Sequence, residues 1–344
     1  MKRTFNALFV LLVLAVAVLG VGVWQIERFM TSELAVPDGG LEFEIPAGSS
    51  FASVTSRLVD TGIIDDDRWF RLRARWSGEA GAVQAGDYLI QSGATPESIL
   101  RQFTSGAVRL YSFTIIEGWN HRDLLTALHA GEAVAASMTD EDWPGLLADL
   151  GATVAHPEGL FLPETYHFPR NTTDRELLAQ AYALMQEVLH EEWQRRDTAT
   201  PLKSPYEALV LASIVEKETA RVDERPRIAG VFTRRLQKGM RLQTDPTVIY
   251  GIGPHFDGNL TRANLRSDTP YNTYTRNGLP PTPIAMPGRA AINSALNPAD
   301  GKALYFVATG LADGSHRFSE TKAEHDAAVA AYLQQLRRQR RQGS

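Results

Sequence analysis

Residues 204–219 read SPYEALVLASIVEKET, and this stretch predicts the helix that carries the main candidate for chemistry. Ser204 and Glu207 have the three-residue spacing of a capping box. Pro205 stands at the first helical position, where its missing N–H costs nothing. We therefore expect a helix that begins at Ser204 and ends in the acidic triplet Glu216-Lys217-Glu218.

Helical phase separates the two glutamates of this triplet. At about 100° per residue, Glu218 shares a face with the apolar residues Leu211, Ile214 and Val215. Glu216 points the other way, toward a smaller and more polar surface. A carboxyl group at the end of an apolar stripe is partly desolvated, which favours its neutral form and suits a general acid.

A plainer interpretation of Glu218 stays open at this point. The carboxylate could pair with Arg221 one turn later, or could be a charged helix end with no further role. Glycoside hydrolysis normally needs two carboxylates, so one glutamate does not identify a reaction.

Two polar segments follow this helix and contain candidates for sugar contacts. An amphipathic helix over residues 228–236 precedes the segment RLQTDPTVIYG at 241–251, in which Thr244 or Asp245 could cap the next helical turn. The segment PYNTYT at 270–275 is followed by GLPPTPI at 278–284. Tyrosines between Asn and Thr offer flat apolar faces with hydrogen-bonding groups, which suit sugar rings. The alternative is a structural loop with proline turns.

A third segment, EGLFLPETY at residues 158–166, places two acids beside aromatic residues. Glu164 is a candidate for substrate contact, and the alternative is a carboxylate at a helix start. The eight histidines show no HExxH or other paired ligand spacing, so no metal site is expected. No nucleophile elbow, phosphate loop or dinucleotide fingerprint is present in the sequence, and no cofactor is expected.

The N-terminus has the pattern of a membrane anchor. Lys2 and Arg3 precede an uncharged run from Phe5 to Trp24, which as a helix would span roughly 30 Å, the thickness of a bilayer core. The positive-inside rule places the rest of the chain outside the cytoplasm. We expect a cytoplasmic tip at 1–4, an anchor at 5–26 and a linker at 27–40, and a cleaved signal peptide is the alternative.

Residues 41–107 predict a small α+β module. Leu41, Phe43 and Ile45 alternate as in a strand, and Thr95 caps a helix that begins at Pro96. The expected order is strand, helix, helix, strand, helix. This order resembles the LysM type of fold, which binds N-acetylglucosamine polymers.

The expected fold class is α+β, with the N-terminal transmembrane helix, the LysM-like module and a larger mixed α/β catalytic domain. A connecting subdomain is expected at 108–155, the catalytic domain at 156–336 and a basic tail at 337–344. The net charge of −5 gives no reason to expect a nucleic-acid partner. The chain has no cysteine, which excludes disulfides, thiolate metal sites and a cysteine nucleophile.

Several motifs in register resemble the endolytic murein transglycosylase (YceG-like) family. They are LASIVEKET at 211–219, RLQTDPTVIY at 241–250, YNTY at 271–274, GLPP at 278–281 and, more loosely, residues 158–166. With the single N-terminal anchor, the resemblance spans nearly the whole chain. One departure is Glu164, where the family often has aspartate, and the acid is retained.

The resemblance implies a lytic transglycosylase that cleaves the MurNAc–GlcNAc β-1,4 bond within nascent strands, leaves 1,6-anhydro-MurNAc ends and terminates strand elongation. It implies Glu218 as the catalytic acid and base. The expected substrate contacts are Gln243, Thr244, Asp245, Tyr250, Tyr271, Asn272, Thr273, Tyr274, Glu164 and Glu216.

The implied setting is the inner membrane, with a cytoplasmic N-terminus and a periplasmic catalytic domain. The implied partners are glycan strands, peptidoglycan synthases and division proteins. A non-catalytic glycan-binding envelope protein and a lysozyme-like muramidase are the alternatives.

Overall fold

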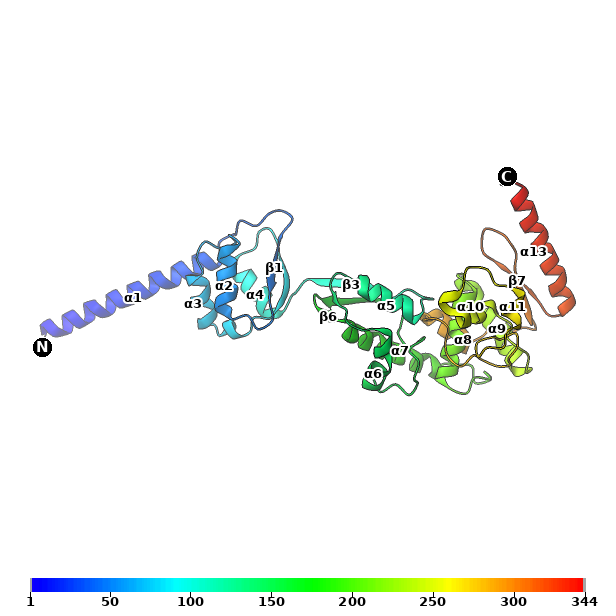
Figure 1. Cartoon of the computed structure of the whole chain (residues 1–344). Helices are drawn as coiled ribbons and strands as arrows, with labels where there is room; N and C mark the ends of the chain where they lie inside the picture. The colour runs from blue at the N-terminus through cyan, green and yellow to red at the C-terminus, as the bar shows by residue number, and fades with distance from the viewer. Residues whose placement is uncertain (1, 343–344) are drawn as a thin grey trace. The chain divides into compact units, whose positions relative to one another are not determined.

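The computed structural model describes residues 2–342, which form two compact units of helices and short strands. Unit 1 holds residues 2–111 with 167–171, and unit 2 holds residues 112–166 with 172–342. Figure 1 shows the elements of both units along the chain. The predicted class is confirmed in a coarser form, as a mixed α/β chain with one N-terminal apolar helix.

Unit 1 has the element order predicted for residues 41–107. Its elements are α1 (Lys2–Met30), β1 (Leu41–Ile45), α2 (Phe51–Asp60), α3 (Arg68–Trp76), the 3-10 turn η1 (Glu79–Gly81), β2 (Gly86–Ile90) and α4 (Pro96–Ser105). β1 and β2 pair antiparallel, with Leu41 opposite Ile90. As predicted, Thr95 caps α4, because its hydroxyl accepts the Ser98 N–H at 3.2 Å.

Aromatic side chains fill the core of unit 1. Phe43 from β1 and Phe103 from α4 stack with ring centroids 5.5 Å apart, and Tyr88 from β2 packs on Phe103 at 4.6 Å. All three rings are buried, together with Phe70 of α3. Alternate residues of each strand thus point into one core, as the period of a strand requires.

The predicted linker at 27–40 is corrected by the structure. α1 runs on to Met30, and Ile26 and Met30 lie in the same core with 6% and 3% of their surface exposed. Leu34 continues the packing, and its N–H donates to the Ala94 carbonyl at 2.9 Å. The apolar part of α1, Leu8–Met30, is long and apolar enough to cross a membrane by length and composition.

A two-stranded ribbon joins the units. β3 (Leu110–Thr114) pairs with β5 (Thr165–Pro169), and the division between the units crosses this ribbon. The predicted separate subdomain at 108–155 is not found as such, because residues 112–155 belong to unit 2 together with residues 156–166 and 172–342.

The remaining elements build unit 2. They are α5 (His121–Ala130), β4 (Val134–Ala135), η2 (Asp140–Asp142), α6 (Trp143–Asp149), β6 (Thr172–Thr173), α7 (Asp174–Gln194), α8 (Pro205–Glu218), η3 (Val222–Glu224), α9 (Arg225–Gln237), α10 (Asp245–Ile252), η4 (Gly253–His255), α11 (Arg262–Arg266), α12 (Arg289–Leu296), β7 (Tyr305–Ala308), β8 (His316–Ser319) and α13 (Lys322–Gln342). β4 and β6 pair parallel, and β7 and β8 pair antiparallel. The predicted basic tail is the end of α13 as far as residue 342.

α8 is the central helix of unit 2. Every residue from 208 to 215 is buried, and α7, α9, α10 and α12 all contact it. Ala291 and Ala295 of α12 have no exposed surface, which is consistent with close packing of α12 on α8 through small side chains.

The start of α8 matches the prediction in part. Ser204 accepts the Glu207 N–H at 3.2 Å, and Pro205 occupies the first turn. The Glu207 carboxylate accepts from the Lys203 N–H at 2.6 Å instead of from Ser204, so the capping box is only half formed. The cap is nevertheless sufficient to satisfy one of the free N–H groups at the helix start.

Candidate active site

Glu218 is the last residue of α8 and faces a cavity of about 440 Å³. The hydroxyl of Thr244, at the start of α10, donates a hydrogen bond to its Oε1. The cavity is lined by Glu218, Arg235, Leu242, Gln243, Thr244, Asp245, Tyr274, Tyr305, Phe306, Val307, Lys322, His325 and Val329. The structure thus brings five sequence-predicted residues together: Glu218, Gln243, Thr244, Asp245 and Tyr274.

The surroundings of Glu218 favour its protonated form. Burial raises the pKa of its carboxyl group to about 7, and the negative charge of Asp245 adds to the rise. The Thr244 hydrogen bond and the Arg235 cation act in the opposite direction. The carbonyl end of α8 also disfavours a negative charge at this position. A carboxyl group that titrates near pH 7 can both donate and accept a proton at neutral pH.

Glu218 keeps a partly exposed surface at the cavity although protein atoms surround its carboxyl group on most sides. The apolar stripe predicted beneath it does not distinguish it from Glu216, because α8 is buried on all sides from residue 208 to residue 215. What distinguishes Glu218 is the cavity. The plainer pairing with Arg221 does not occur, since Arg221 pairs with Asp223 at 2.7 Å.

A buried network of threonines fixes the partner of Glu218. The Thr244 N–H donates to the Thr273 hydroxyl at 3.1 Å, and the Thr247 hydroxyl donates to the Thr244 carbonyl at 2.8 Å. Thr244 is the N-cap of α10 but makes no side-chain cap, because its hydroxyl is directed to Glu218. The preceding Gln243 has a φ of 53°, in the left-handed region that few non-glycine residues adopt.

Asp245 supplies a second carboxylate on the cavity wall. The Tyr274 hydroxyl donates to its Oδ1 at 2.6 Å. Burial, this hydrogen bond and the nearby carboxylates raise the pKa of the Tyr274 hydroxyl, so it stays a neutral donor. This bond holds Asp245 beside Glu218, where its charge contributes to the raised pKa of Glu218.

The other residues that line this cavity were not among the predicted contacts. Arg235 of α9 is buried and donates to the carbonyl groups of Leu304 and Leu242 at 2.7 and 2.6 Å. Tyr305 of β7 stacks on His325 of α13 with centroids 5.2 Å apart. Burial lowers the pKa of the His325 ring. The apolar run at Tyr305 indicates a strand, but no local signal indicates that it faces Glu218.

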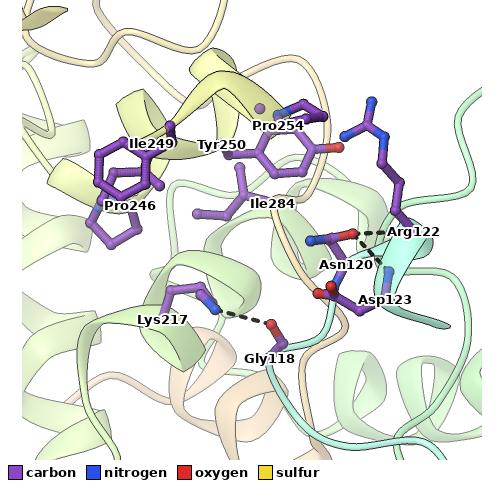
Figure 2. A pocket seen from close by; sticks show the side chains of 12 residues that line it. Gly118, Asn120, Arg122, Asp123, Lys217, Pro246, Ile249, Tyr250, Pro254 and Ile284 are labelled. Atoms are coloured by element: carbon purple, nitrogen blue, oxygen red, sulfur yellow. Dashed lines mark hydrogen bonds between the residues drawn. The ribbon is translucent and has the colours of Figure 1, made fainter. Parts of the chain in front are cut away.

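A second cavity of about 580 Å³ lies at the same two helix ends (Figure 2). Lys217 and Pro246, the chain neighbours of Glu218 and Asp245, line it. The Lys217 ammonium donates to the Gly118 carbonyl at 3.1 Å. Tyr250, a predicted contact, lies here with Ile249, Pro254, Phe256 and Ile284, and Arg122 closes one side.

Glu158 stands behind this second cavity and was not selected from the sequence. Its side chain has no exposed surface, and its Oε2 accepts from the Tyr250 hydroxyl at 2.9 Å and contacts the His121 Nδ1 at 2.7 Å. Its Oε1 has no hydrogen-bond partner within residues 2–342. Glu164 of the same segment, which is the predicted contact, is exposed and lines neither cavity.

Glu216, a predicted substrate contact, lines neither cavity. Its side chain is only 5% exposed, and it accepts from the Arg225 guanidinium at 2.6 Å and the Gly288 N–H at 3.0 Å. Burial raises the pKa of its carboxyl group, and Arg225 and Gly288 oppose that rise. The polar surface predicted for this face of α8 is therefore a buried ion pair.

Three residues of the predicted YNTY contact make hydrogen bonds within the protein. Asn272 has no exposed surface, and its amide donates to the Ser267 carbonyl at 2.6 Å. Thr273 is buried in the threonine network, and the Tyr271 hydroxyl bonds the Thr282 hydroxyl at 2.8 Å. Asn272 and Thr273 therefore hold the loop that carries Tyr274.

Comparisons with known proteins identify the family of this chain. The model of the YceG-like family matches residues 43–331. The endolytic murein transglycosylase of Bacillus subtilis is 32% identical over 310 residues, and the match covers 85% of each chain. That of Streptococcus pneumoniae is 28% identical and matches 84% of this chain but 58% of its own length.

A crystal structure of a YceG-like protein from Listeria monocytogenes also matches. It superposes with a TM-score of 0.54 at 29% identity, covering 85% of this chain and 99% of that one. No group of three or more histidine and acidic side chains suited to a metal ion occurs in the part of the chain that the structure describes. From the family model, which covers well over half of its length, the chain belongs to the YceG-like family.

Proposed function

We propose that this chain is an endolytic murein transglycosylase that cuts the glycan strands of peptidoglycan with Glu218 as its acid and base. The observation that carries the proposal is the Glu218 carboxyl, whose pKa is raised to about 7 at a cavity wall. The relatives named endolytic murein transglycosylase support the substrate class.

The reaction begins with protonation of the leaving group. Protonated Glu218 gives its proton to the glycosidic oxygen between MurNAc and GlcNAc, and the bond from that oxygen to C1 of MurNAc breaks. The carbonyl oxygen of the substrate's own N-acetyl group bonds to C1 and carries the positive charge. This substrate assistance replaces the second enzymic nucleophile of ordinary retaining glycosidases.

The second step closes a ring and returns the proton. Ionised Glu218 takes the proton from the C6 hydroxyl of MurNAc while O6 bonds to C1 and the N-acetyl oxygen leaves. The product ends in 1,6-anhydro-MurNAc, no water is consumed, and Glu218 is protonated again. Asp245, held by Tyr274, is placed to stabilise the positive charge that develops in the first step.

The two cavities suit a strand that passes through the site and is cut internally. Lys217 and Pro246 line one cavity, and Glu218 and Asp245, their chain neighbours, line the other. Aromatic faces beside hydrogen-bonding groups line both cavities, and prolines also line the second one, which suits the apolar faces and hydroxyl groups of sugar rings. We assign Gln243 and Tyr274 to the sugar next to the cleaved bond, and Tyr250 to sugars on the far side.

Digestion of purified sacculi tests this assignment. The full chain should release muropeptides with anhydro ends, and Glu218→Gln should release none. Glu187→Gln changes an exposed glutamate of α7 and is the matched control, with activity expected as in the parent. Anhydro products from Glu218→Gln at the parent rate would overturn the role of Glu218.

A lysozyme-like muramidase is the second candidate, because Asp245 puts a second carboxylate on the cavity wall. A hydrolase needs such a partner to activate water or to bond to C1. Its products end in reducing MurNAc and are heavier by one water, so mass spectrometry of the same digest separates the two reactions. We favour the transglycosylase because the relatives bear that name.

We infer further that α1 anchors the chain in the inner membrane with its N-terminus in the cytoplasm and unit 2 in the periplasm. Its apolar length and the cations before the run support this placement. Unit 1 is proposed as a LysM-like glycan-binding module, which the order strand, helix, helix, strand and the antiparallel β1–β2 pair support. Binding of unit 1 to chitin oligomers would test that role.

A further inference from the structure

The membrane helix enters unit 1 without a flexible break. Val23 and Trp24 of α1 are exposed at 41% and 58%, whereas Ile26 and Met30, within the next two turns, lie in the core of unit 1. A continuous α-helix rises about 1.5 Å per residue, so the exposed apolar part ends within about 10 Å of the core of unit 1. Any surface of unit 1 beside these turns is therefore close to the level at which α1 leaves the apolar layer.

α3 is the element that lies at this level. Figure 1 draws it beside the end of α1 that enters unit 1, and the two helices are in contact. A surface hollow of about 320 Å³ is lined by Val23, Ile26 and Glu27 of α1 together with Arg73, Trp76 and Ser77 from the end of α3. Val23 lies near the end of the exposed part of the apolar helix, so Trp76 lies at the height where that exposed part ends.

The outward face of α3 has the composition of a membrane-surface helix. Arg68, Leu72, Arg75 and Trp76 share this face by their spacing, and all four are exposed. Leu72 is 48% and Trp76 69% exposed, so two large apolar side chains lie one turn apart on the same exposed face. Tryptophan and arginine together are typical of the membrane–water interface.

The arginines of α3 differ in whether they form ion pairs. At its beginning, Arg68 pairs with Asp66 and Arg71 pairs with Asp67 at 3.3 Å. Near its end, Arg73 pairs with Glu79 at 3.3 Å, but the Arg75 guanidinium has no ion pair or hydrogen bond among residues 2–342. The free cation thus lies at the end of α3 that faces the apolar span.

We propose that Leu72, Arg75 and Trp76 form a second membrane contact, in which the two apolar side chains enter the interface and Arg75 binds the phosphate of anionic phospholipids. The proposal rests on the membrane anchor of the proposed function and is independent of the catalytic assignment. With α1 as the first contact and this patch as the second, the tilt of unit 1 on the bilayer is fixed. The partner is a lipid surface, for which the patch has both the apolar and the cationic component.

The test uses the absence of cysteine from the chain, which allows one label at one position. The full-length protein carries Trp76→Cys or, as control, Ala47→Cys in the exposed turn after β1. Each is labelled with a polarity-sensitive fluorophore and placed in vesicles of phosphatidylglycerol and phosphatidylcholine that contain nitroxide-labelled lipid. We expect label 76 to be quenched several-fold more strongly than label 47.

Equal quenching at the two positions would overturn the proposal. A label at 76 that is shielded from water but not quenched by lipid would overturn it as well, because a protein surface would then cover the patch. Both substituted positions are exposed, so neither change should prevent folding. The same measurement on the Glu218→Gln chain should be unchanged, which separates this proposal from the catalytic one.

Charge reversal tests the lipid class. Adding Arg75→Glu to the Trp76→Cys chain should weaken association of the label with phosphatidylglycerol by at least about fivefold, the equivalent of one cation at an anionic surface. Arg101→Glu on α4, which changes another exposed arginine of unit 1, is the control and should have little effect. Equal effects of both reversals would show that the general charge of unit 1, and not the patch, attracts the lipid, and would overturn the role of Arg75.

Discussion

The Thr244 hydroxyl donates a hydrogen bond to the Glu218 carboxylate, although the two residues lie 26 positions apart. Thr244 stands at the N-cap of α10 and Glu218 at the last position of α8, so the bond joins the ends of two helices. It stabilises the ionised form of a carboxyl group that burial otherwise keeps neutral. The bond thus sets how readily Glu218 gives up and recovers its proton.

Thr244→Val tests this relationship. Loss of the donor should raise the pKa of Glu218 above about 7, and a hydrogen bond to a charged group corresponds to a shift of about 1–2 pH units. Glu218 acts first as an acid, so activity falls as pH rises through its pKa. The alkaline limb of the pH profile of kcat/KM on sacculi should therefore move to higher pH.

Thr244→Ser keeps the hydroxyl and is the control, with its alkaline limb expected where the parent has it. If the alkaline limb of the Thr244→Val profile coincides with that of the parent, then the Thr244 hydrogen bond to Glu218 does not set the pKa that controls this limb.

The raised pKa of Glu218 also predicts a pH-dependent cost in stability. Because the folded-state pKa of about 7 lies above the ordinary glutamate value of 4.5, the folded chain holds this proton more tightly than the unfolded chain. The associated stability is fully present below pH 4.5 and is lost as pH rises through about 7. Glu218→Gln, which cannot ionise, should be more stable than the parent at pH 8 by up to about 3 kcal/mol.

Urea unfolding of both chains at pH 4 and pH 8 measures this difference. The two chains should have similar unfolding free energies at pH 4, and the inactive variant should be the more stable at pH 8. If the variant is less stable than the parent at pH 8, the ionised Glu218 carboxylate does not destabilise the folded chain, and the prediction is wrong.

Local signals predicted the start of the central helix and the position of its acid. Ser204 and Pro205 act within one turn, and the Glu218 and Asp245 segments were identified by motifs that are contiguous in the chain. The buried network of Glu158 has no such signal, since its partners His121 and Tyr250 lie 37 and 92 positions away. A charged residue becomes a core residue only through such contacts, which a single sequence does not specify.

The predicted contacts that lie away from both cavities have the same explanation, because contacts with other parts of the chain place them there. Asn272 was expected to bind sugar because an amide in a tyrosine-rich loop suits that role, but its amide donates to three carbonyl groups at the end of α11. A loop has no period from which the inward side could be read. Helical phase predicts that Glu216 points away from Glu218. Because α8 is covered by protein on both sides, the face that carries Glu216 is also buried.

Glu216 and Arg225 should behave as a structural pair. Glu216→Ala leaves the Arg225 guanidinium, which is 5% exposed, with only the partly exposed Glu117 as an ion-pair partner. Breaking a buried ion pair typically costs about 3–5 kcal/mol, so the variant should lose most of its unfolding free energy and its activity together. Thermal unfolding followed by circular dichroism measures the loss.

The double variant Glu216→Leu with Arg225→Met separates structure from chemistry. It removes both charges and keeps the volume, and such replacements are often neutral or stabilising. It should regain most of the stability and the activity on sacculi. A stable but inactive double variant would return Glu216 to the list of residues that act on the substrate.

Tyr250→Phe separates the two roles of Tyr250. The hydroxyl donates to the fully buried Glu158 carboxylate, while the ring lines the second cavity. Loss of the donor leaves Glu158 with one partner fewer and should lower the unfolding free energy by about 1–3 kcal/mol. The ring remains for the sugar, so KM and the pH profile should be unchanged, whereas Tyr250→Ala should raise KM as well.

Tyr271→Phe, whose hydroxyl bonds Thr282 instead, is the matched control for loss of a tyrosine hydroxyl nearby. A shift of the pH profile in Tyr250→Phe alone would mean that Glu158 and Tyr250 take part in proton transfer, because a purely structural hydrogen bond changes stability without changing which groups titrate during catalysis.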